Sequence, residues 1–161
     1  MRTLRHATAF ATILTLIGSG LVSAGDARPM TGSFTAGVVP VAQRCGPGAL
    51  TIGFEISGVA SHLGRLTGTG TNCTEFTLAT SAVAVWDGET TVTAADGSTI
   101  TTVSVGTQQA PVNGVATYAI THTVTSGSGR FADASGVWLL TGTINFLTGA
   151  VDGSLDGWLS Y

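Results

Sequence analysis

Two side chains capable of acid–base chemistry, Tyr118 and His122, lie four residues apart in a segment that alternates apolar residues with threonine. Positions two and four apart on a β-strand share a face, so a phenol and an imidazole would point into one cavity. Trp138, on a later strand-like segment, could line the same space. The simpler interpretation is a core histidine that hydrogen-bonds to backbone or to a neighbour. We therefore predict Tyr118, His122 and Trp138 as ligand-binding residues and assign no catalytic residue.

Other arrangements that enzymes use are weaker in this sequence. Glu55 and Glu75 lie at polar strand positions and would have to meet in one cleft to hydrolyse a glycoside. Asp152 and Asp156 share a strand face, but their spacing matches no calcium loop. His62 fits an exposed strand or loop, and no Ser-His-Asp arrangement is visible. Phosphate-binding glycine motifs, zinc-ligand spacings and haem attachment sequences are also missing, so we expect no metal and no cofactor.

The two cysteines, Cys45 and Cys73, are predicted to form a disulfide if the chain is exported, because oxidising compartments favour disulfides over thiols. The bridge would close a loop of 28 residues, and such a loop contributes about 3.5 kcal/mol of stability. Two free buried cysteines are the alternative. Asn72-Cys73-Thr74 also matches a glycosylation sequon, a short motif that supports no conclusion here.

Composition restricts the classes of partner. Only 9% of the 161 residues are charged, and the formal net charge is -3; ordinary soluble domains have roughly 25% charged residues. The six basic side chains are all arginine and form no basic run, so we expect no nucleic acid and no anionic lipid as partner. A hydrophobic fraction of 43% argues against disorder, while 27 threonines and 23 glycines favour strands and turns.

Residues 1–24 have the parts of a secretory signal peptide. Arg2 and Arg5 precede an uncharged apolar run over residues 7–22, and Val22-Ser23-Ala24 offers the small residues that a signal peptidase reads. A second cleavage point follows residue 27. A membrane anchor would need about 20 apolar residues, and this run is shorter and ends in glycine and serine. We therefore expect a secreted, extracellular protein that keeps no membrane segment after cleavage.

Alternation with a period of two dominates the rest of the chain. Apolar residues occupy one face of each strand-like run, and threonine or other polar residues occupy the opposite face. With a first strand at Ser33–Val41, about eight strands are expected, and no window shows a helical period. The clearest of these strands are Ala49–Gly58, Val115–Thr125, Val137–Phe146 and Ala150–Tyr161.

The connections predict a sheet that closes on itself. Asp87-Gly88, Asp96-Gly97 and Pro111–Gly114 have turn chemistry, and Thr74–Trp86 is predicted as one long strand. Short connections and one-sided burial favour an antiparallel barrel, with a β-sandwich as the alternative. Pairing of the last strand with the first would also hide an exposed sheet edge. We expect an all-β fold: a single eight-stranded antiparallel barrel over residues 33–161.

One segment interrupts the alternation between two clear strands. Residues 127–136 read Gly-Ser-Gly-Arg-Phe-Ala-Asp-Ala-Ser-Gly, which resembles the G-(T/S)-G-x-F-x-x-A-x-G signature of the allene oxide cyclase and dirigent-like barrel superfamily. Bacterial secreted proteins of that superfamily look similar overall, and many have no known activity. The resemblance is specific over Thr123–Tyr161. It implies an eight-stranded antiparallel barrel with a pocket inside it.

The same motif has an architectural interpretation. Its glycines permit left-handed or closely approaching backbone, and its phenylalanine could plug one end of the barrel. Arg130 and Asp133 are expected to pair locally at the surface and not to act in catalysis. The structural residues of the motif are Gly127, Gly129, Phe131, Ala134 and Gly136.

Three functional hypotheses follow. The favoured one is a non-catalytic protein that binds a small apolar ligand inside the barrel or has an extracellular structural role. The second is a cyclase or isomerase acting on a hydrophobic substrate in the same cavity, although no catalytic residue of the plant enzymes aligns with this chain. The third is a cell-wall or protein-interaction module that uses exposed Trp86 and Trp158, and Trp158 is expected to point outward.

Overall fold

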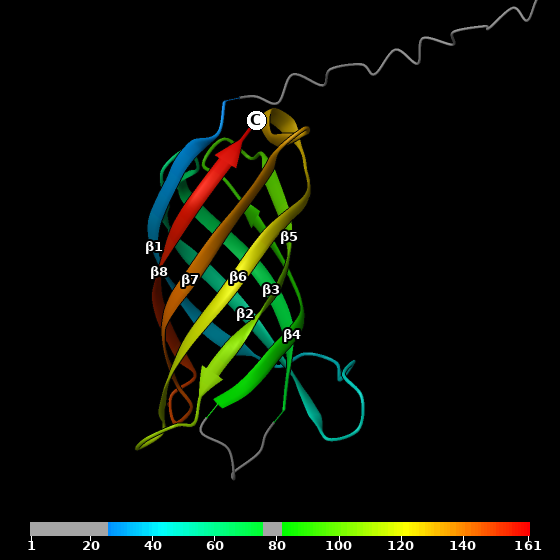
Figure 1. Ribbon diagram of the computed structural model, residues 1–161, viewed down its shortest axis with the longest axis vertical. Coiled ribbons are helices and arrows are strands. Elements are labelled where there is room, and N and C mark those ends of the chain that lie inside the picture. The colour runs from blue at the N-terminus through cyan, green and yellow to red at the C-terminus, as the bar shows by residue number, and fades with distance from the viewer. Residues whose placement is uncertain (1–25, 76–81) are drawn as a thin grey trace, which may run out of the picture.

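A computed structural model describes residues 26–75 and 82–161 of the chain. The expected signal peptide lies outside the described residues. Each strand pairs antiparallel with the next, and β8 pairs with β1, so the sheet closes into a barrel (Figure 1). The eight-stranded barrel is confirmed, and the β-sandwich alternative is wrong. The elements are β1 (Arg28–Val39), β2 (Ala49–Ala60), β3 (Gly64–Glu75), β4 (Ala82–Thr93), β5 (Thr99–Gln109), β6 (Val115–Gly127), the short 3-10 helix η1 (Gly129–Phe131), β7 (Ser135–Asn145) and β8 (Ala150–Ser160).

The alternation of side chains is clearest in β6. Tyr118 and His122 are buried inside the barrel, whereas Thr117 and Thr121 are exposed on its outer surface. Threonine suits such positions, because its branched side chain packs on the pleated sheet while its hydroxyl stays in water. Within the described part of the chain, no helix is long and apolar enough to cross a membrane.

Pairing between β1 and β8 closes the barrel. β1 begins at Arg28, five positions before the expected Ser33, and stays in register with β8 from Arg28↔Leu159 to Gly37↔Ala150. Because both strands are paired along these lengths, the closed sheet leaves no free edge there. The predicted turn before β6 is also present, with positive φ at Asn113 and Gly114 (52° and 81°).

The expected boundaries differ most in β3 and β4. β3 ends at Glu75 and β4 begins at Ala82, so the single strand expected over Thr74–Trp86 is wrong. The turn expected at Asp87-Gly88 is also wrong, because these residues form an irregularity inside β4 where the register with β5 shifts. Asp87 has a φ of 49°. Tight turns and β-bulges both use positive φ, so the two structures share one sequence signal.

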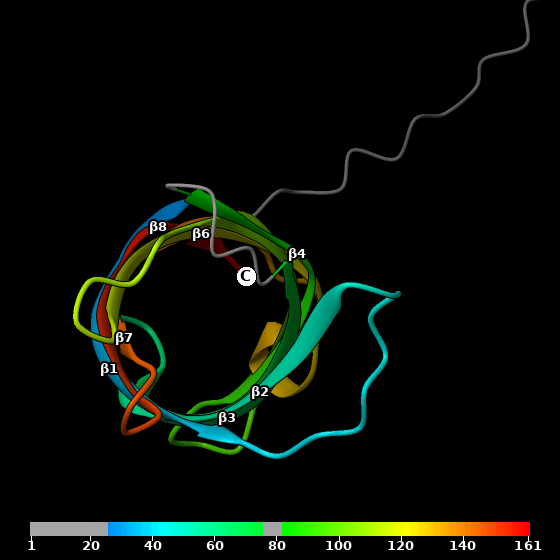
Figure 2. The ribbon, with the colours of Figure 1, turned by 90° about the horizontal axis from the view of Figure 1, so that it is seen from below.

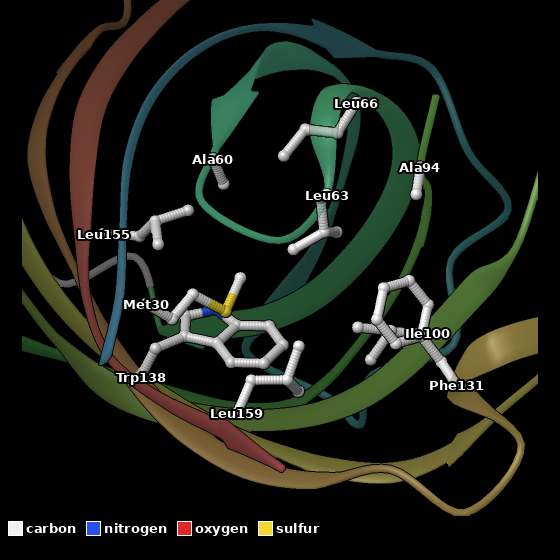
Figure 3. Close-up of a cluster of buried hydrophobic side chains, with 10 residues drawn as sticks. All are labelled: Met30, Ala60, Leu63, Leu66, Ala94, Ile100, Phe131, Trp138, Leu155 and Leu159. Carbon is white, nitrogen blue, oxygen red and sulfur yellow. The ribbon is translucent and has the colours of Figure 1, made fainter. Parts of the chain in front are cut away.

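The two ends of the barrel differ in packing. The end where η1 and the C-terminus lie is filled by an apolar cluster, which we call the plug (Figures 1 and 3). The opposite end, which we call the open end, carries the connections from β1 to β2 and from β7 to β8. Figure 2, viewed from the open end, shows the strands as a ring from which the β1–β2 connection stands away. The plug consists of Met30, Ala60, Leu63, Leu66, Ala94, Ile100, Phe131, Trp138, Leu155 and Leu159.

Candidate ligand-binding cavity

A cavity of about 60 Å³ lies inside the barrel. Ile56 and Leu140 border both the cavity and the plug, so the plug closes the cavity at one end. The apolar part of the lining comes mainly from β1, β2 and β6–β8, whereas β3–β5 supply most of the hydroxyl and amide groups. This second group, which we call the polar wall, consists of Thr71, Asn72, Thr74, Thr90, Ser104 and Gln108.

The cavity opens toward a wider pocket of about 400 Å³ at the open end. Ile52, Thr74 and Gln108 line both spaces, which makes them continuous. The 38–41 segment, which ends β1 and begins the next connection, forms part of the rim. Phe146, expected at the end of a strand, lies just beyond β7 and also lines this pocket. A small molecule could therefore enter the barrel from this end.

His122 lines the cavity, and only 5% of its surface is exposed. Its Nδ1 lies 2.9 Å from Thr102 Oγ1, and that hydroxyl lies 3.4 Å from the carbonyl oxygen of Thr90. The ring also stacks on Trp138, with centroids 6.1 Å apart and planes within 3°. Burial lowers the pKa of His122 to about 4. The imidazole is therefore neutral near pH 7 and held in place by its neighbours.

Tyr118 lies against the wall formed by β7 and β8. Its hydroxyl donates a hydrogen bond of 3.0 Å to the carbonyl oxygen of Asp152. The phenol fits there because Gly142 and Gly153 have no side chain; a Cβ at either position would lie within 2.6 Å of the Tyr118 hydroxyl oxygen. Burial, and secondarily the negative charge of Asp152, raise the pKa of Tyr118. The phenol is thus protonated near neutral pH, and its proton is engaged by the wall.

The three residues predicted to bind a ligand therefore occupy different places. Tyr118 and His122 both line the cavity. Trp138 belongs to the plug (Figure 3), and its ring stacks on that of His122. Four strand positions separate Tyr118 from His122, a distance of about 13 Å. Each of the two has its own hydrogen-bond partner in the wall. They do not form an acid–base pair with each other.

Asn72 lines the cavity, whereas its sequence context indicates only a glycosylation sequon. Its side chain points inward from β3 and is 8% exposed, so the folded barrel has no room for a glycan on this amide. Among the described residues, none donates a hydrogen bond to its Oδ1. The sequence feature that could have placed Asn72 inside the barrel is its alternation with Cys73, whose side chain faces outward and forms the disulfide. The glycine- and threonine-rich sequence of β3 obscured that alternation.

The motif at residues 127–136 lies at the plugged end. Phe131 is completely buried in the plug. A Cβ at Gly127 would come within 2.2 Å of the Phe131 carbonyl oxygen, and one at Gly136 within 2.6 Å of that of Trp158. Gly129 has a φ of 59° and begins η1, while Ala134 packs against the plug from outside. The motif thus folds the chain closely over the end of the barrel.

Arg130 has a different partner from the one expected. Its Nε lies 3.0 Å from a carboxylate oxygen of Asp96, and its Nη2 donates to the carbonyl oxygen of His62 at 2.5 Å. The expected pairing with Asp133 is therefore wrong. Asp96 and His62 lie in the connections that precede β5 and β3, so Arg130 ties η1 to two neighbouring hairpins.

The disulfide between Cys45 and Cys73 is present. It fixes the β1–β2 connection to the outer surface of β3, where Cys73 is buried beneath it. Thr51 Oγ1 accepts hydrogen bonds from the backbone N–H groups of Arg44 and Cys45, and Arg44 forms an ion pair with Asp87 in the β4 irregularity. These contacts hold the connection that continues from the rim of the open end.

The remaining candidates for chemistry do not converge. Glu55 is exposed on the outer face of β2, whereas Glu75 ends β3 at the open-end pocket, so no carboxylate pair forms between them. Trp158 is 41% exposed, which confirms its outward direction. Trp86 is half-buried on β4, on the opposite side of the ring from β8, so the two tryptophans form no cluster. Within residues 26–75 and 82–161, no group of metal-binding side chains gathers.

Known proteins resemble this chain only weakly. No protein-family model matches the chain, and no curated protein matches it. Among solved structures, the chain is similar to that of the pterocarpan synthase dirigent protein PsPTS1, with 12% sequence identity and a TM-score of 0.49. The similarity covers 86% of this chain and 97% of that one. At this level it transfers no residue role to this chain.

Proposed function

We propose that this protein is an exported barrel that binds a small, mainly apolar molecule in its interior without transforming it chemically. The observation that carries this proposal is the cavity, which the plug closes at one end and which continues into the pocket at the other. Ligand sites typically combine an apolar lining with a few fixed polar groups. The apolar residues of β1, β2 and β6–β8, set opposite the polar wall, match that description.

The cyclase or isomerase alternative has less support. Its two candidate residues are neutral near pH 7, and their hydrogen bonds go to the wall. A general acid or base works best when its pKa lies near the working pH, and neither residue meets this condition. Binding does not require a pKa near the working pH, so the same geometry favours a carrier or receptor of a small molecule.

Export is the second part of the proposal. The sequence of residues 1–24 supports it, and the disulfide is compatible with an oxidising compartment. N-terminal sequencing of protein recovered from the culture medium of its own host should start at Gly25 or Arg28. Recovery of the full-length chain from the cell interior only would contradict export.

Native mass spectrometry of the protein from its own host tests ligand binding. The wild type should carry a small molecule that is released on unfolding. Ala36→Leu adds volume at the cavity wall, so this variant should no longer carry the molecule. Thr35→Leu introduces the same side chain at the neighbouring position, which is exposed on the outer face, so this control variant should still carry it. Detection of the bare protein mass alone in the wild type would contradict the proposal.

A further inference from the structure

The open end of the barrel is surrounded by exposed apolar side chains. More than half of the large apolar residues that are exposed in the described chain lie at this end, on strand ends or connections, and we call them the collar. Val112 in the β5–β6 connection and Leu147 in the β7–β8 connection are 72% and 79% exposed. Both connections lie at the open end (Figure 1). The collar consists of Val38, Val41, Leu50, Val112, Val115, Phe146 and Leu147.

The connections at the plugged end show the opposite distribution. There the large apolar residues Leu63 and Phe131 are buried, and the exposed positions are small or polar, with charges on Asp96, Arg130 and Asp133. The composition of the chain alone therefore does not explain the exposed collar. A concentrated apolar patch on the surface of a protein marks a site of contact with a partner or with a membrane.

Contacts between connections join the collar residues into one surface. The backbone N–H of Phe146 donates to the carbonyl oxygen of Gly114 at 2.8 Å, and that of Val38 donates to the carbonyl oxygen of Gly149 at 2.9 Å. The side chain of Leu147 lies over Gly114, where a Cβ would come within 2.6 Å of the Leu147 Cγ. Several collar residues also line the pocket of about 400 Å³. The collar therefore borders the entrance to the cavity.

The charges near the collar restrict what it can bind. The β5–β6 and β7–β8 connections, residues 110–114 and 146–149, contain no charged side chain. Arg44, on the β1–β2 connection, is paired with Asp87, and Glu75 at the pocket is acidic. Among the described residues, this end therefore offers no free cation to an anionic surface. Apolar burial must supply the binding energy, so the partner must present hydrocarbon.

The arrangement of the collar favours a lipid surface over a folded partner. Its side chains come from separate connections around an opening, so a rigid protein surface would need a matching hollow for each of them. Lipid chains rearrange around inserted apolar groups, and binding then increases with the apolar area that is buried. A second copy seated mouth to mouth would also block the entrance to the cavity. A bilayer covers the collar and dissolves the kind of apolar molecule that the cavity fits.

We propose that the collar docks the open end of the barrel onto a lipid surface without net charge, with Val112 and Leu147 inserted at the boundary between headgroups and acyl chains. The contact is peripheral and needs no membrane segment, so it is compatible with export of the barrel. This inference goes beyond ligand binding, because docking occurs whether or not the cavity is filled.

Co-sedimentation with phosphatidylcholine vesicles tests the docking without any ligand. The wild type should sediment with the vesicles equally well at about 0.05 and 0.5 M NaCl, because salt screens only charge interactions. Val112→Thr combined with Leu147→Thr should weaken the partition into vesicles at least about tenfold, the effect of losing two buried apolar side chains. Val105→Thr combined with Leu139→Thr makes the same changes at exposed positions on the outer wall and should leave the partition unchanged.

A measurement on the wild type alone locates the contact. In phosphatidylcholine bicelles, a spin-labelled lipid should broaden the backbone amide signals of residues 112–115 and 146–148 in NMR spectra, and it should spare those of residues 96–97 and 130–133 at the plugged end. Broadening confined to the plugged end would overturn the proposal.

Three other outcomes would also overturn the docking proposal while leaving ligand binding intact. The first is a wild type that does not sediment with the vesicles, and the second is an equal loss of partition in the two paired variants. The third is a dimer, seen by sedimentation velocity in place of vesicle binding, that Val112→Thr with Leu147→Thr dissociates. In that case a second copy of the chain would cover the collar.

Discussion

Inside the barrel a titratable side chain has lost most of its water, and His122 and Tyr118 respond in opposite directions. Desolvation disfavours the charged form of each, so the pKa of the imidazole falls and that of the phenol rises. In the sequence both residues are candidates for acid–base chemistry because their charge can change with pH. In the folded protein both are held neutral, and they serve as polar parts of a mainly apolar lining.

Acid should therefore weaken the fold through His122. Its pKa falls from 6.5 to about 4 on folding, so between these values the unfolded chain binds a proton that the folded chain does not. Stability is fully retained above pH 6.5 and decreases as the pH falls through this window, by about 3 kcal/mol. Urea unfolding of His122→Gln should show a smaller loss over the same range.

His62→Gln is the matched control for this titration. His62 lies at the plugged end, where its Nε2 is 3.0 Å from the Pro29 carbonyl oxygen, and it does not line the cavity. This variant should lose stability in acid as the wild type does. If His122→Gln lost as much stability as the wild type between pH 6.5 and about 4, burial of the imidazole would not be the cause.

At the scale of elements, the sequence predicts those strands in which apolar and polar residues alternate strictly. β6, β7 and β8 were expected within a few residues of their actual bounds because large apolar side chains recur at every second position on one face of each strand. β3 and β4 were not, because Gly, Thr and Ala give little contrast between faces. Asp87-Gly88 was read as a turn because a bulge needs the same backbone conformation.

The plug should supply a large share of the stability. Phe131→Ala removes a fully buried ring from the cluster and should lower the free energy of unfolding by about 3–5 kcal/mol. Phe146→Ala makes the same chemical change at a residue that is 37% exposed at the open end, and it should cost less than about 1 kcal/mol. Equal losses in urea unfolding would mean that the motif at residues 127–136 does not anchor the plugged end.

The disulfide should stabilise the barrel by restricting the unfolded chain. Replacing Cys45 and Cys73 together by serine opens a loop of 28 residues and should lower the free energy of unfolding by about 3.5 kcal/mol. Arg44→Ala removes the ion pair with the Asp87 carboxylate and the hydrogen bond to the Asp87 carbonyl oxygen, both at the surface, and leaves the disulfide intact. Urea unfolding should therefore detect a loss below about 1 kcal/mol. A serine variant as stable as the wild type would show that the other contacts of the connection are sufficient.

At the scale of the whole molecule, closure could be predicted from the sequence, whereas the content of the barrel could not. Short connections and one apolar face per strand favour a closed antiparallel sheet whatever the interior holds. The cavity depends on how side chains from eight strands fill the centre. This filling is set by the volumes of those side chains and by their hydrogen-bond partners. Asn72 illustrates this, because the lack of a donor for its Oδ1 among the described residues is evident only once the side chains around it have been placed.

The sparse charge of the molecule leads to a further prediction. The two ion pairs between side chains found among the described residues, Arg44–Asp87 and Arg130–Asp96, are both at the surface. Raising NaCl from about 0.05 to 0.5 M weakens such exposed pairs, yet it should change the free energy of unfolding by less than about 1 kcal/mol. A much larger decrease in urea unfolding would show that ionic contacts hold the barrel together.

The contrast between the plugged and open ends also has a kinetic meaning. Because the plug closes one end of the barrel, a ligand bound in the cavity must leave through the open end by which it entered. A competitor cannot reach the bound ligand from the plugged end. Exchange of one bound molecule for another should then proceed at the rate of spontaneous departure, independent of how much competitor is added. The side chains at the rim, including Val38 and Phe146, would set that rate without touching the bound molecule at its deepest position.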